Sequence, residues 1–536
     1  MTTETSIYEY ARRGLNLSAE KTAIWFQGRD ISYHELFTRI DCAAEQLASI
    51  GVRCGTVVTI HLPNCPQAVI AIYAVAKLGG ICNMAHAQTP SLALKELLNF
   101  AESNFLFTYL PENQRLASHT VIIDIFGRAT DQQISGQDQW VSMNLSTNLD
   151  HTEHKIVDIP EQSLLADECA FYLHSSGTTG TPKTIMLAHN ALNHCVENTA
   201  DLFELRDMAD HASLGVLPLF HGFGLAMDMH RNISFGSKLV QMLRWNASEA
   251  VQLIKNHHVS SIVGVPTMYY ALLNEPEFSG EKIRQLERCC VGGDDVKVDL
   301  VKTFDSRVGR NGCMLVGYGL TEATTTNLVN SYLHYKAGSC GFPMRNTTAA
   351  VINDDGVISM QGKGELIINS KTLMIGYLKE PTEDVTIYAD GLRWIRTGDL
   401  VKIDDDGFVF FLSRLKNIIS HNGYNVYPIQ VEDVIRNVSG ISDVCVVGVA
   451  NQKHHTQDIR AVIIAEDPTK TNTLRNAVIQ TCIERLPRYS VPQEIIFVSA
   501  FPRNAMDKID RKKMSTPILF GDDELLSTCT NQEKTM

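Results

Sequence analysis

The stretch Phe171-Tyr-Leu-His-Ser-Ser-Gly-Thr-Thr-Gly-Thr-Pro-Lys-Thr-Ile185 carries glycines, hydroxyl residues and one lysine between two apolar segments. Glycines let the backbone turn its N–H groups toward an anion, and hydroxyls add further donors. Lys183 adds a charge that can follow a β- or γ-phosphate. The stretch therefore predicts a phosphate-binding loop and a nucleotide ligand. The alternative on local composition is a surface turn without a ligand.

The loop is not of the Walker type. Gly177-Thr-Thr-Gly-Thr-Pro-Lys-Thr184 nearly satisfies that pattern, but Pro182 stands where the second glycine belongs. Proline has no N–H to give to a phosphate and fixes φ near −65°. A Walker loop also opens a helix, whereas the apolar segment Thr184-Ile-Met-Leu-Ala-His189 is closer to a second strand. The sequence therefore disfavours a P-loop NTPase.

Length and composition indicate a multidomain enzyme. A chain of 536 residues and 59.6 kDa suggests roughly two to four domains. The N-terminus has no signal-peptide pattern, and no run reaches the ~18 apolar residues of a membrane span. The net charge of −13 argues against nucleic acid as a partner. We expect a cytoplasmic enzyme with no membrane span and no nucleic-acid partner, and the charge says little about small substrates.

Cysteine and histidine spacing gives no sign of a structural metal site. The thirteen cysteines are scattered, and Cys289-Cys290 lies inside an apolar segment, so most are expected to be reduced core residues. No Cys-x-x-Cys pair occurs, and the His257-His258 and His454-His455 doublets have no partners at metal-ligand spacing.

Apolar strands alternate with amphipathic helices, which predicts an α/β fold with buried sheets. Val57–Leu62 followed by Gln67–Leu78 is one such unit, and the pattern recurs at 246–266 and near Cys313–Val316. Gly292-Gly293 and Gly317-Tyr-Gly319 follow apolar segments. They are candidate pocket walls, because ligands bind beyond strand ends in α/β sheets. Simple turns are the alternative.

The chain is expected to divide near the basic stretch Ser413-Arg-Leu-Lys-Asn417. We predict a large N-terminal domain at 1–413, a hinge at 414–417 and a small α/β domain at 418–514. Residues 515–536 have weak periodicity and are expected to form a loose tail.

Several motifs occur in the order found in the adenylate-forming superfamily, and the chain resembles that superfamily over nearly its whole length. The superfamily contains acyl-CoA synthetases, firefly-type luciferases and peptide-synthetase adenylation domains, and the motifs are closest to those of acyl- or aryl-CoA ligases. Besides the loop, they are Ile31-Ser-Tyr-His-Glu-Leu36, Leu217-Pro-Leu-Phe-His-Gly-Phe-Gly224, Gly317-Tyr-Gly-Leu-Thr-Glu322, Gly364-Glu-Leu366, Arg396-Thr-Gly-Asp399, Ser413-Arg-Leu-Lys416 and Lys508-Ile-Asp-Arg511.

The resemblance implies a large N-terminal domain of layered α/β subdomains and a small, mobile C-terminal domain. It also implies an AMP-forming acid–thiol ligase. A carboxylic acid attacks the α-phosphate of ATP, pyrophosphate leaves, and the acyl- or aryl-adenylate then passes its acyl group to the thiol of coenzyme A. Domain rotation about the hinge residue Lys416 would switch one site between the two half-reactions.

The resemblance also assigns roles to individual residues. Lys508 is the mobile catalytic lysine, Glu322 the magnesium ligand with Thr178 beside it, Asp399 the ribose acceptor, and Arg414 a donor to ribose or phosphate. Gly423 would reach the pantetheine tunnel. The expected nucleotide and cofactor residues are Ser175, Ser176, Gly177, Thr178, Thr179, Gly180, Lys183, Gly293, Asp294, Gly317, Tyr318, Gly319, Thr321, Asp399, Arg414 and Gly423.

His221 stands where related ligases place a histidine between the acid pocket and the thiol path, and a core histidine is the alternative. Amino-acid-activating relatives usually carry an aspartate just after the aromatic residue of this motif, whereas Phe220 is followed here by His221. An α-amino acid is therefore disfavoured. The expected lining of the acid pocket is His221, Phe223, Met229, Gly292 and Gly317.

The chain departs from the superfamily pattern at several positions. Thr184 replaces the glycine that usually follows the loop lysine, and Asp507 replaces the glycine before Lys508. Asn417 stands where an aspartate is common, and Ile81-Cys-Asn-Met-Ala-His86 replaces a proline-rich segment. Together these departures indicate a divergent member with an unusual substrate or partner, and Asp507 and Thr184 leave open a degenerate, non-catalytic nucleotide-binding member. The identity of the acid stays open, and so does a separate carrier protein, with its phosphopantetheine arm, as acceptor in place of coenzyme A.

Overall fold

The computed structural model describes residues 3–125, 143–145, 159–174, 183–203, 210–331, 334–353, 355–381, 385–422, 424–451, 456–503 and 509–516. The chain forms two compact units. The first consists of Met1–Ala349, Ile368–Ile395 and Gly407–Val409, and the second of Ala350–Ile367, Arg396–Asp406 and Phe410–Met536. The predicted hinge at 414–417 stays a prediction, and all but two residues of the predicted tail lie outside the described residues.

A seven-stranded sheet in the first unit carries the predicted phosphate-loop region. Its order is β19-β8-β7-β4-β3-β5-β6, in which β8 runs antiparallel to both of its neighbours, β7 and β19, and the other neighbouring pairs are parallel. A strand thus follows Lys183, as predicted, and the Walker alternative with its helix is excluded. The strands are β3 (Val57–His61), β4 (Ile81–Met84), β5 (Phe105–Thr108), β6 (His119–Ile122), β7 (Cys169–His174), β8 (Thr184–Ala188) and β19 (Gly376–Tyr377).

A nine-stranded sheet of the first unit has the order β15-β14-β13-β12-β11-β9-β10-β1-β2. Its central strands are parallel, and antiparallel strands close both edges. The strands are β1 (Thr22–Phe26), β2 (Arg29–Ser32), β9 (Ala212–Gly215), β10 (Lys238–Gln241), β11 (Ser261–Gly264), β12 (Arg288–Val291), β13 (Met314–Tyr318), β14 (Leu328–Asn330) and β15 (Phe342–Pro343).

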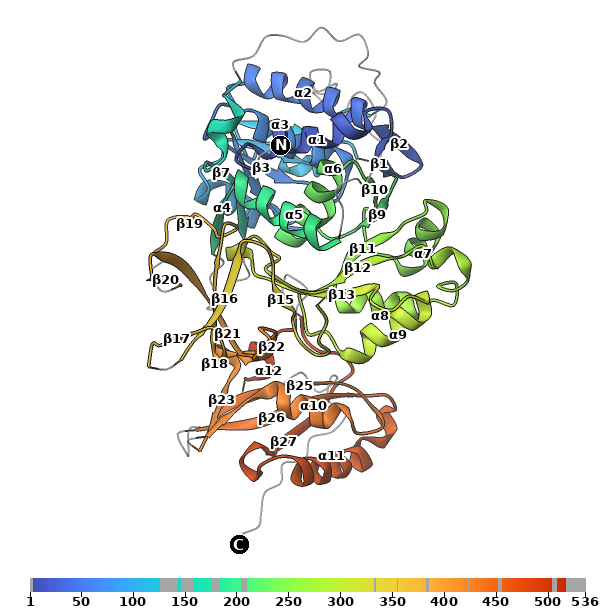
Figure 1. The fold of residues 1–536 in the computed structure, drawn as a ribbon, viewed down its shortest axis with the longest axis vertical. Helices are drawn as coiled ribbons and strands as arrows, with labels where there is room; N and C mark the ends of the chain where they lie inside the picture. Colours follow the sequence, from blue (N-terminus) through green and yellow to red (C-terminus); the bar gives the residue numbers. More distant parts are fainter. Residues whose placement is uncertain are drawn as a thin grey trace. The chain divides into compact units, whose positions relative to one another are not determined.

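Helices of the first unit pack around these sheets (Figure 1). Helix α3 is apolar on all sides and its residues Pro66–Ala76 are buried, as expected for a helix enclosed by other elements. The helices are α1 (Ile7–Ser18), α2 (Tyr33–Ser49), α3 (Pro66–Lys77), α4 (Ser91–Phe100), α5 (His189–Phe203), the π-helix η4 (Gly224–His230), α6 (Arg231–Ser234), α7 (Ala247–Asn256), α8 (Pro266–Asn274) and α9 (Val298–Val308).

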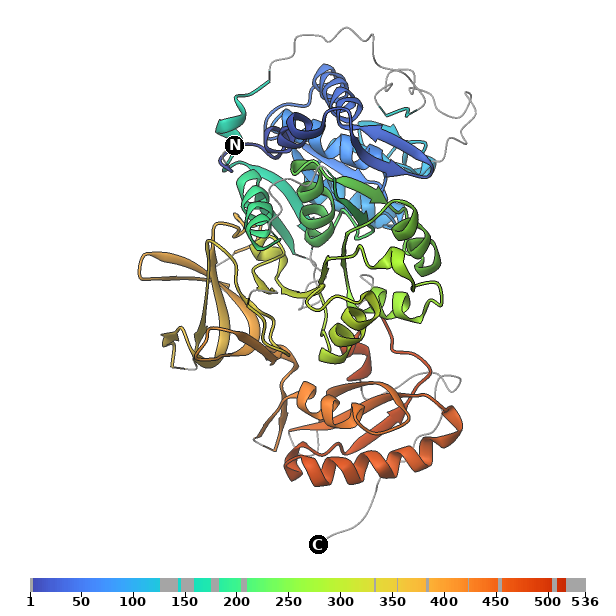
Figure 2. The ribbon, with the colours of Figure 1, turned by 45° about the vertical axis from the view of Figure 1, so that its right-hand side comes forward.

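A further sheet has the order β17-β16-β18-β21-β20, with β22 paired to β21. Figure 2 shows its long strands in yellow and orange. Its strands are β16 (Thr347–Ile352), β17 (Ile358–Ser359), β18 (Gly362–Ser370), β20 (Thr386–Ala389), β21 (Leu392–Ile403) and β22 (Val409–Arg414). The hairpin of β23 (Ile419–His421) and β24 (Tyr424–Val426) follows in the second unit.

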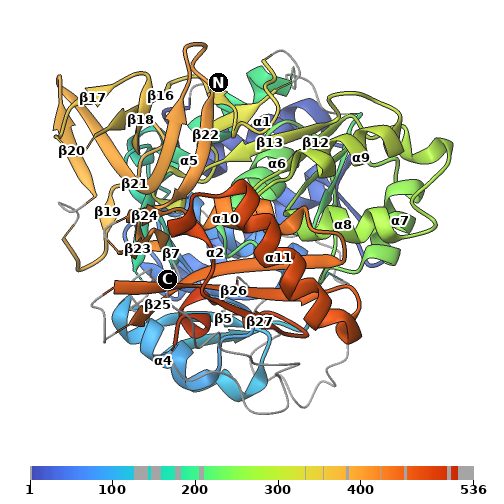
Figure 3. The same cartoon turned by 90° about the horizontal axis from the view of Figure 1, so that it is seen from below.

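The C-terminal part of the second unit is a small α/β module (Figure 3). Strands β25 (Ile441–Asn451), β26 (Thr456–Ala465) and β27 (Glu494–Phe497) form its sheet. Helices α10 (Pro428–Arg436) and α11 (Thr471–Arg485) cover one face, on which Val444, Val446 and Ile459 are buried. The alternate residues Cys445 and Val447 face helix α12 (Arg511–Met514). Successive residues of β25 therefore lie in two hydrophobic cores, one on each face of the sheet.

The described ranges contain no helix long and apolar enough to cross a membrane. Within the same ranges the cysteines are free thiols, as predicted.

Candidate active site

Two predicted site residues, Lys183 and Glu322, meet two neighbouring side chains, Tyr377 and Glu380, at the start of β8 in the first unit. Lys183 directly precedes β8, and Tyr377 of β19 pairs with Ile185 of that strand. The Lys183 Nζ atom lies 4.5 Å from the centre of the Tyr377 ring and 3.8 Å from the Glu380 carboxylate. The Tyr377 hydroxyl donates a hydrogen bond of 3.1 Å to Glu322 Oε1. One aromatic side chain thus joins the predicted phosphate lysine to the predicted metal carboxylate.

The Glu322 carboxylate accepts its hydrogen bond from a hydroxyl that stays protonated. Burial, with the nearby Glu322 carboxylate adding to it, raises the pKa of Tyr377, so its hydroxyl stays a donor at neutral pH. Glu322 is only half-buried and lies on the short helix η6 (Thr321–Ala323). A lone carboxylate fits magnesium, which takes one or two carboxylates and completes its shell with phosphates and water. Among the residues described, no group of three His, Cys, Asp or Glu side chains could hold a metal by itself.

The glycine-rich turns after β12 and β13 bring together the residues predicted to line the nucleotide pocket. The two strands are parallel neighbours. A Cβ atom at Gly292 would lie 2.6 Å from the Gly317 carbonyl oxygen, and one at Gly319 would lie 1.3 Å from the Thr325 carbonyl oxygen. Close backbone packing therefore requires these glycines, whether or not a ligand binds. Gly293 and Asp294, which follow β12, are exposed, whereas Tyr318 is the last residue of β13 and Thr321 begins the short helix after it.

Asp399 and Arg414 also come together, in the second unit. Asp399 lies in β21, and Arg414 ends the neighbouring strand β22. The Asp399 side chain is 1% exposed, and its Oδ1 atom lies 2.7 Å from the Arg414 Nε atom. The guanidinium compensates the buried negative charge, while its own side chain remains 43% exposed.

A second carboxylate fixes the backbone before Asp399. Glu365 accepts from Arg396 Nε at 2.8 Å, from the Arg396 Nη2 atom, and from the Gly398 N–H at 3.0 Å. Gly398 has a φ of 70°, a conformation that favours glycine. Hydrogen bonds therefore join the motifs Gly364-Glu-Leu366 and Arg396-Thr-Gly-Asp399, and together they fix the backbone before Asp399.

The turn that carries His221 is held by buried polar side chains. Asn64 Nδ2 donates to the carbonyl oxygens of Val216 and Leu217, each at 3.0 Å, and its Oδ1 accepts from the Leu219 N–H at 3.2 Å. Asp228 Oδ2 accepts from the N–H groups of Val216 and Leu217 at 3.1 and 2.9 Å. Backbone groups of the segment that leads to His221 thus have fixed partners.

His221 itself is half-buried, so the alternative of a fully enclosed core histidine does not describe it. Its Nδ1 atom lies 3.2 Å from the Phe223 N–H, which can only donate. A neutral ring therefore carries its proton on Nε2.

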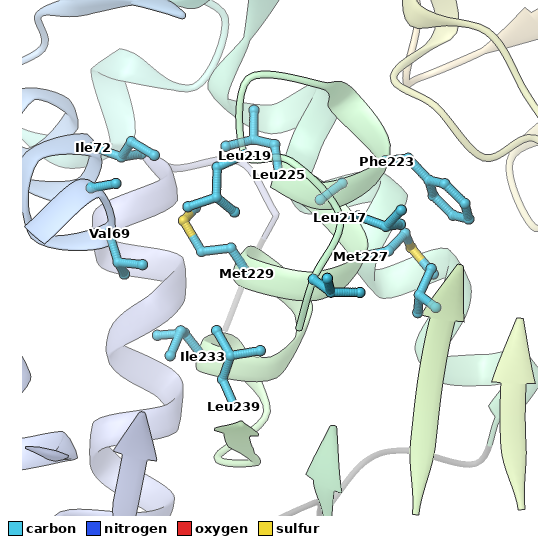
Figure 4. Close-up of a cluster of buried hydrophobic side chains, with 14 of the residues drawn as sticks. Val69, Ile72, Leu217, Leu219, Phe223, Leu225, Met227, Met229, Ile233 and Leu239 are labelled. Atoms are coloured by element: carbon cyan, nitrogen blue, oxygen red, sulfur yellow. The ribbon is translucent and has the colours of Figure 1, made fainter. Parts of the chain in front are cut away.

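Phe223 and Met229 point to different sides of the π-helix (Figure 4). Met229 has no exposed surface and belongs to the same cluster of buried hydrophobic side chains as Val69 and Ile72 of α3. Its surroundings are those of a core residue, and its role in the acid pocket stays a prediction. Phe223, at the start of the π-helix, is nearly buried on the other side. A π-helix is rare and often occurs at functional sites.

The remaining predicted residues fall into two groups. Lys416 is exposed on the short helix η7 (Leu415–Asn417). Outside the described residues lie Ser175, Ser176, Gly177, Thr178, Thr179, Gly180, Gly423, Asp507 and the catalytic candidate Lys508.

Sequence reasoning did not single out Tyr377, Asn64 or Asp228 as site residues, and it named Glu365 only as part of a motif. Tyr377 carries no local signal, because its partners lie 55 or more residues away in the chain. Glu365 could have been found from the sequence, because it adjoins the apolar run Leu366-Ile-Ile368, and a carboxylate that is buried with such a strand needs a partner.

Comparison with known proteins assigns the family. The model described as "AMP-binding enzyme" matches residues 12–378, and "AMP-binding enzyme C-terminal domain" matches residues 430–508. A long-chain-fatty-acid–CoA ligase of Bacillus subtilis is 27% identical over 520 residues, covering 92% of this chain and 91% of that protein. A feruloyl-CoA synthase of an Amycolatopsis species is 26% identical, covering 93% and 96%.

The fold agrees with a solved structure of ATP-bound MatB from Rhodopseudomonas palustris. The TM-score is 0.82 at 23% identity, over 94% of this chain and 98% of that one. The chain belongs to the AMP-binding enzyme family. The predicted α/β fold with a large and a smaller domain, and the predicted ligase class, are thereby confirmed.

Proposed function

We propose that this chain activates a carboxylic acid with ATP and transfers the acyl group to the thiol of coenzyme A. A carboxylate oxygen bonds to the α-phosphorus, the bond to the β-phosphate oxygen breaks, and pyrophosphate leaves. The thiol sulfur then bonds to the acyl carbon, its proton is lost, and AMP leaves. The observation that carries the proposal is the cluster of Lys183, Tyr377 and Glu322 in a chain of the AMP-binding family.

The cluster meets the main difficulty of the first step, which brings two anions together. In this proposal Lys183 binds the β- and γ-phosphates, and Glu322 holds magnesium with Thr178 nearby. Magnesium, when bound, neutralises phosphate charge. Tyr377 keeps Glu322 oriented and lies under the lysine ammonium, which limits the positions that Lys183 can take. Fixed positive charge at a phosphoryl group typically supplies a large share of the rate enhancement.

Asp399 and Arg414 are proposed to bind the ribose. An ionised carboxylate accepts two O–H donors, and the ribose offers two neighbouring hydroxyls. Arg414 is exposed enough to bind the nucleotide as well as Asp399. Lys508 as catalytic lysine, Lys416 as hinge and Gly423 beside pantetheine rest on the resemblance and the family match, and remain parts of this proposal.

The acid is proposed to lack an α-ammonium group, because the His221 turn offers an imidazole where a carboxylate would be needed. Relatives that are named for a long-chain fatty acid and for ferulate support an aliphatic or aryl acid. A carrier protein as acceptor is the second candidate, and a cytoplasmic location is part of the proposal.

Product analysis tests this function. Purified chain is incubated with ATP, magnesium, coenzyme A and an acid panel of graded fatty acids, benzoates and cinnamates. Mass spectrometry should detect one class of acyl-CoA together with AMP and pyrophosphate. Thioester on a carrier protein but never on coenzyme A would favour the second candidate. No adenylate with any acid would favour a non-catalytic nucleotide-binding protein.

A further inference from the structure

Two departures from the superfamily pattern meet at one half-buried histidine, His174. Thr184 stands where a glycine is usual, and Asn83 lies in the segment that replaces the proline-rich one. They are about 100 residues apart in sequence. His174 Nδ1 lies 2.9 Å from the Thr184 hydroxyl, and His174 Nε2 lies 2.8 Å from Asn83 Oδ1. Asn83 Nδ2 in turn donates to the Thr59 hydroxyl at 2.9 Å. The two departures are therefore parts of one hydrogen-bonded chain.

The direction of each hydrogen bond follows from the groups present. The Asn83 carbonyl oxygen can only accept, so a neutral His174 ring carries its proton on Nε2. Nδ1 is then an acceptor, and the Thr184 hydroxyl must donate to it. Burial lowers the pKa of His174 to about 4, so the ring is neutral at physiological pH. Thr59 and Asn83 are fully buried and Thr184 nearly so, and loss of a partner would leave a polar atom unsatisfied.

Thr184 directly follows Lys183, so the contacts of Thr184 determine where the Lys183 backbone lies. His174 and Thr184 are the last cross-strand pair of β7 and β8. The Thr184 carbonyl oxygen accepts from the Leu378 N–H at 2.8 Å, which ties β8 to the residue after Tyr377. The side chain of Thr184 thus fixes β8 to the sheet, and its backbone fixes β8 to β19. These two attachments therefore set the backbone positions of Lys183, which precedes Thr184, and of Tyr377, which precedes Leu378.

We propose that His174, held between Asn83 and Thr184, is a positioning residue that fixes Lys183 for the β- and γ-phosphates of ATP. The proposal rests on the proposed function of Lys183. It accounts for Thr184 in place of glycine, because glycine has no hydroxyl to donate to the ring. His174 acts through Lys183 and does not itself touch the nucleotide.

The test measures binding of two nucleotides by the full chain without an acid substrate, using isothermal titration calorimetry with magnesium. Thr184→Val keeps the branched shape of the side chain and removes the hydroxyl, and Thr184→Ser restores it. The matched control is Thr108→Val, because Thr108 makes a similar buried bond of 2.9 Å to His61 on β3 and β5. Thermal melting establishes that each variant is folded.

Thr184→Val should raise the Kd for ATP about tenfold and leave the Kd for AMP within about twofold, since AMP lacks the phosphates that Lys183 binds. Thr184→Ser and Thr108→Val should bind ATP within about twofold of wild type. Equal weakening of ATP and AMP, unchanged ATP binding by Thr184→Val, or weakening as large in Thr108→Val would overturn the proposal.

The same titrations separate this inference from the proposed function. A wild-type chain that binds ATP but forms no adenylate contradicts the proposed function, and the variant comparison still decides the role of His174. A folded wild-type chain that binds no ATP overturns both.

Discussion

Glu322 and Asp399 are both predicted to serve the nucleotide, yet the structure surrounds them differently. Glu322, in the first unit, is half-buried and bonded to the neutral hydroxyl of Tyr377. Asp399, in the second unit, is almost fully buried and bonded to the guanidinium of Arg414. A carboxylate whose charge is not cancelled by its neighbour suits a cation, whereas one whose charge is compensated suits neutral donors such as ribose hydroxyls. The contrast predicts that Glu322 matters for catalysis and Asp399 for both binding and stability.

The largest effect is expected for Glu322→Gln. The amide is a poor magnesium ligand, so kcat for adenylate formation should fall about 1000-fold. The melting temperature should change little, because the glutamine amide oxygen can accept the hydrogen bond that Tyr377 donates to Glu322. Stopped assays of AMP formation and thermal melts measure the two. A fall of less than about tenfold would contradict the assignment of Glu322 to the metal.

Asp399→Asn should lower kcat/KM for ATP about 100-fold, mainly through KM, because charge-assisted bonds to the ribose are lost. It should also destabilise the chain by about 1 to 2 kcal/mol. The loss of stability is limited because the Arg414 guanidinium is partly exposed, and water can hydrate it once the carboxylate is gone. Steady-state kinetics and urea unfolding give the two values. An unchanged KM for ATP would remove Asp399 from the nucleotide site.

Glu365→Gln should raise KM for ATP about tenfold, because Gly398 and Arg396 lose the carboxylate that fixes the backbone before Asp399. The matched control is Glu494→Gln, which breaks the pair of 2.6 Å with Arg460 elsewhere in the second unit. Both variants should lower the melting temperature, and only the first should change KM. Equal KM values would show that the Glu365 pair is structural only.

The smallest effect is expected for Tyr377→Phe. The ring remains under Lys183, and only the hydrogen bond to Glu322 is lost, so kcat should fall about threefold. Tyr377→Leu, which also removes the aromatic face, should raise KM for ATP in addition. If the two variants had the same KM for ATP, the contact of Lys183 with the ring would make no contribution to ATP binding.

Sequence was sufficient for features that depend on local pattern. The apolar segment after Lys183 predicted β8, and the unit at residues 57–78 predicted a strand followed by a helix, which the structure has as β3 and α3. Sequence also singled out Lys183, Glu322, Asp399 and Arg414 through the family resemblance. It could not show that Tyr377 joins Lys183 to Glu322, or that Glu365 supports the backbone before Asp399. Those contacts arise when β19 pairs with β8 and when β18 and β21 share a sheet, and no local pattern encodes such pairings.

The contacts of His174 are a second example of what the sequence could not predict. The departures at Thr184 and at Ile81–His86 look independent in the sequence, and with the others they suggested a divergent member of the superfamily. The structure makes Thr184 and Asn83 partners of one ring, because β4 pairs with β7 and β7 with β8. A departure from a family pattern can therefore be a compensated change.

The central claim is that this chain forms an adenylate at a site built around Lys183 and Glu322. Exchange of labelled pyrophosphate into ATP, measured without coenzyme A, tests it most directly. Wild-type chain should show exchange that depends on one class of acid, and Glu322→Gln should lose nearly all of it while remaining folded. Absence of acid-dependent exchange from folded wild-type chain across the whole acid panel, or undiminished exchange in Glu322→Gln, would contradict the account.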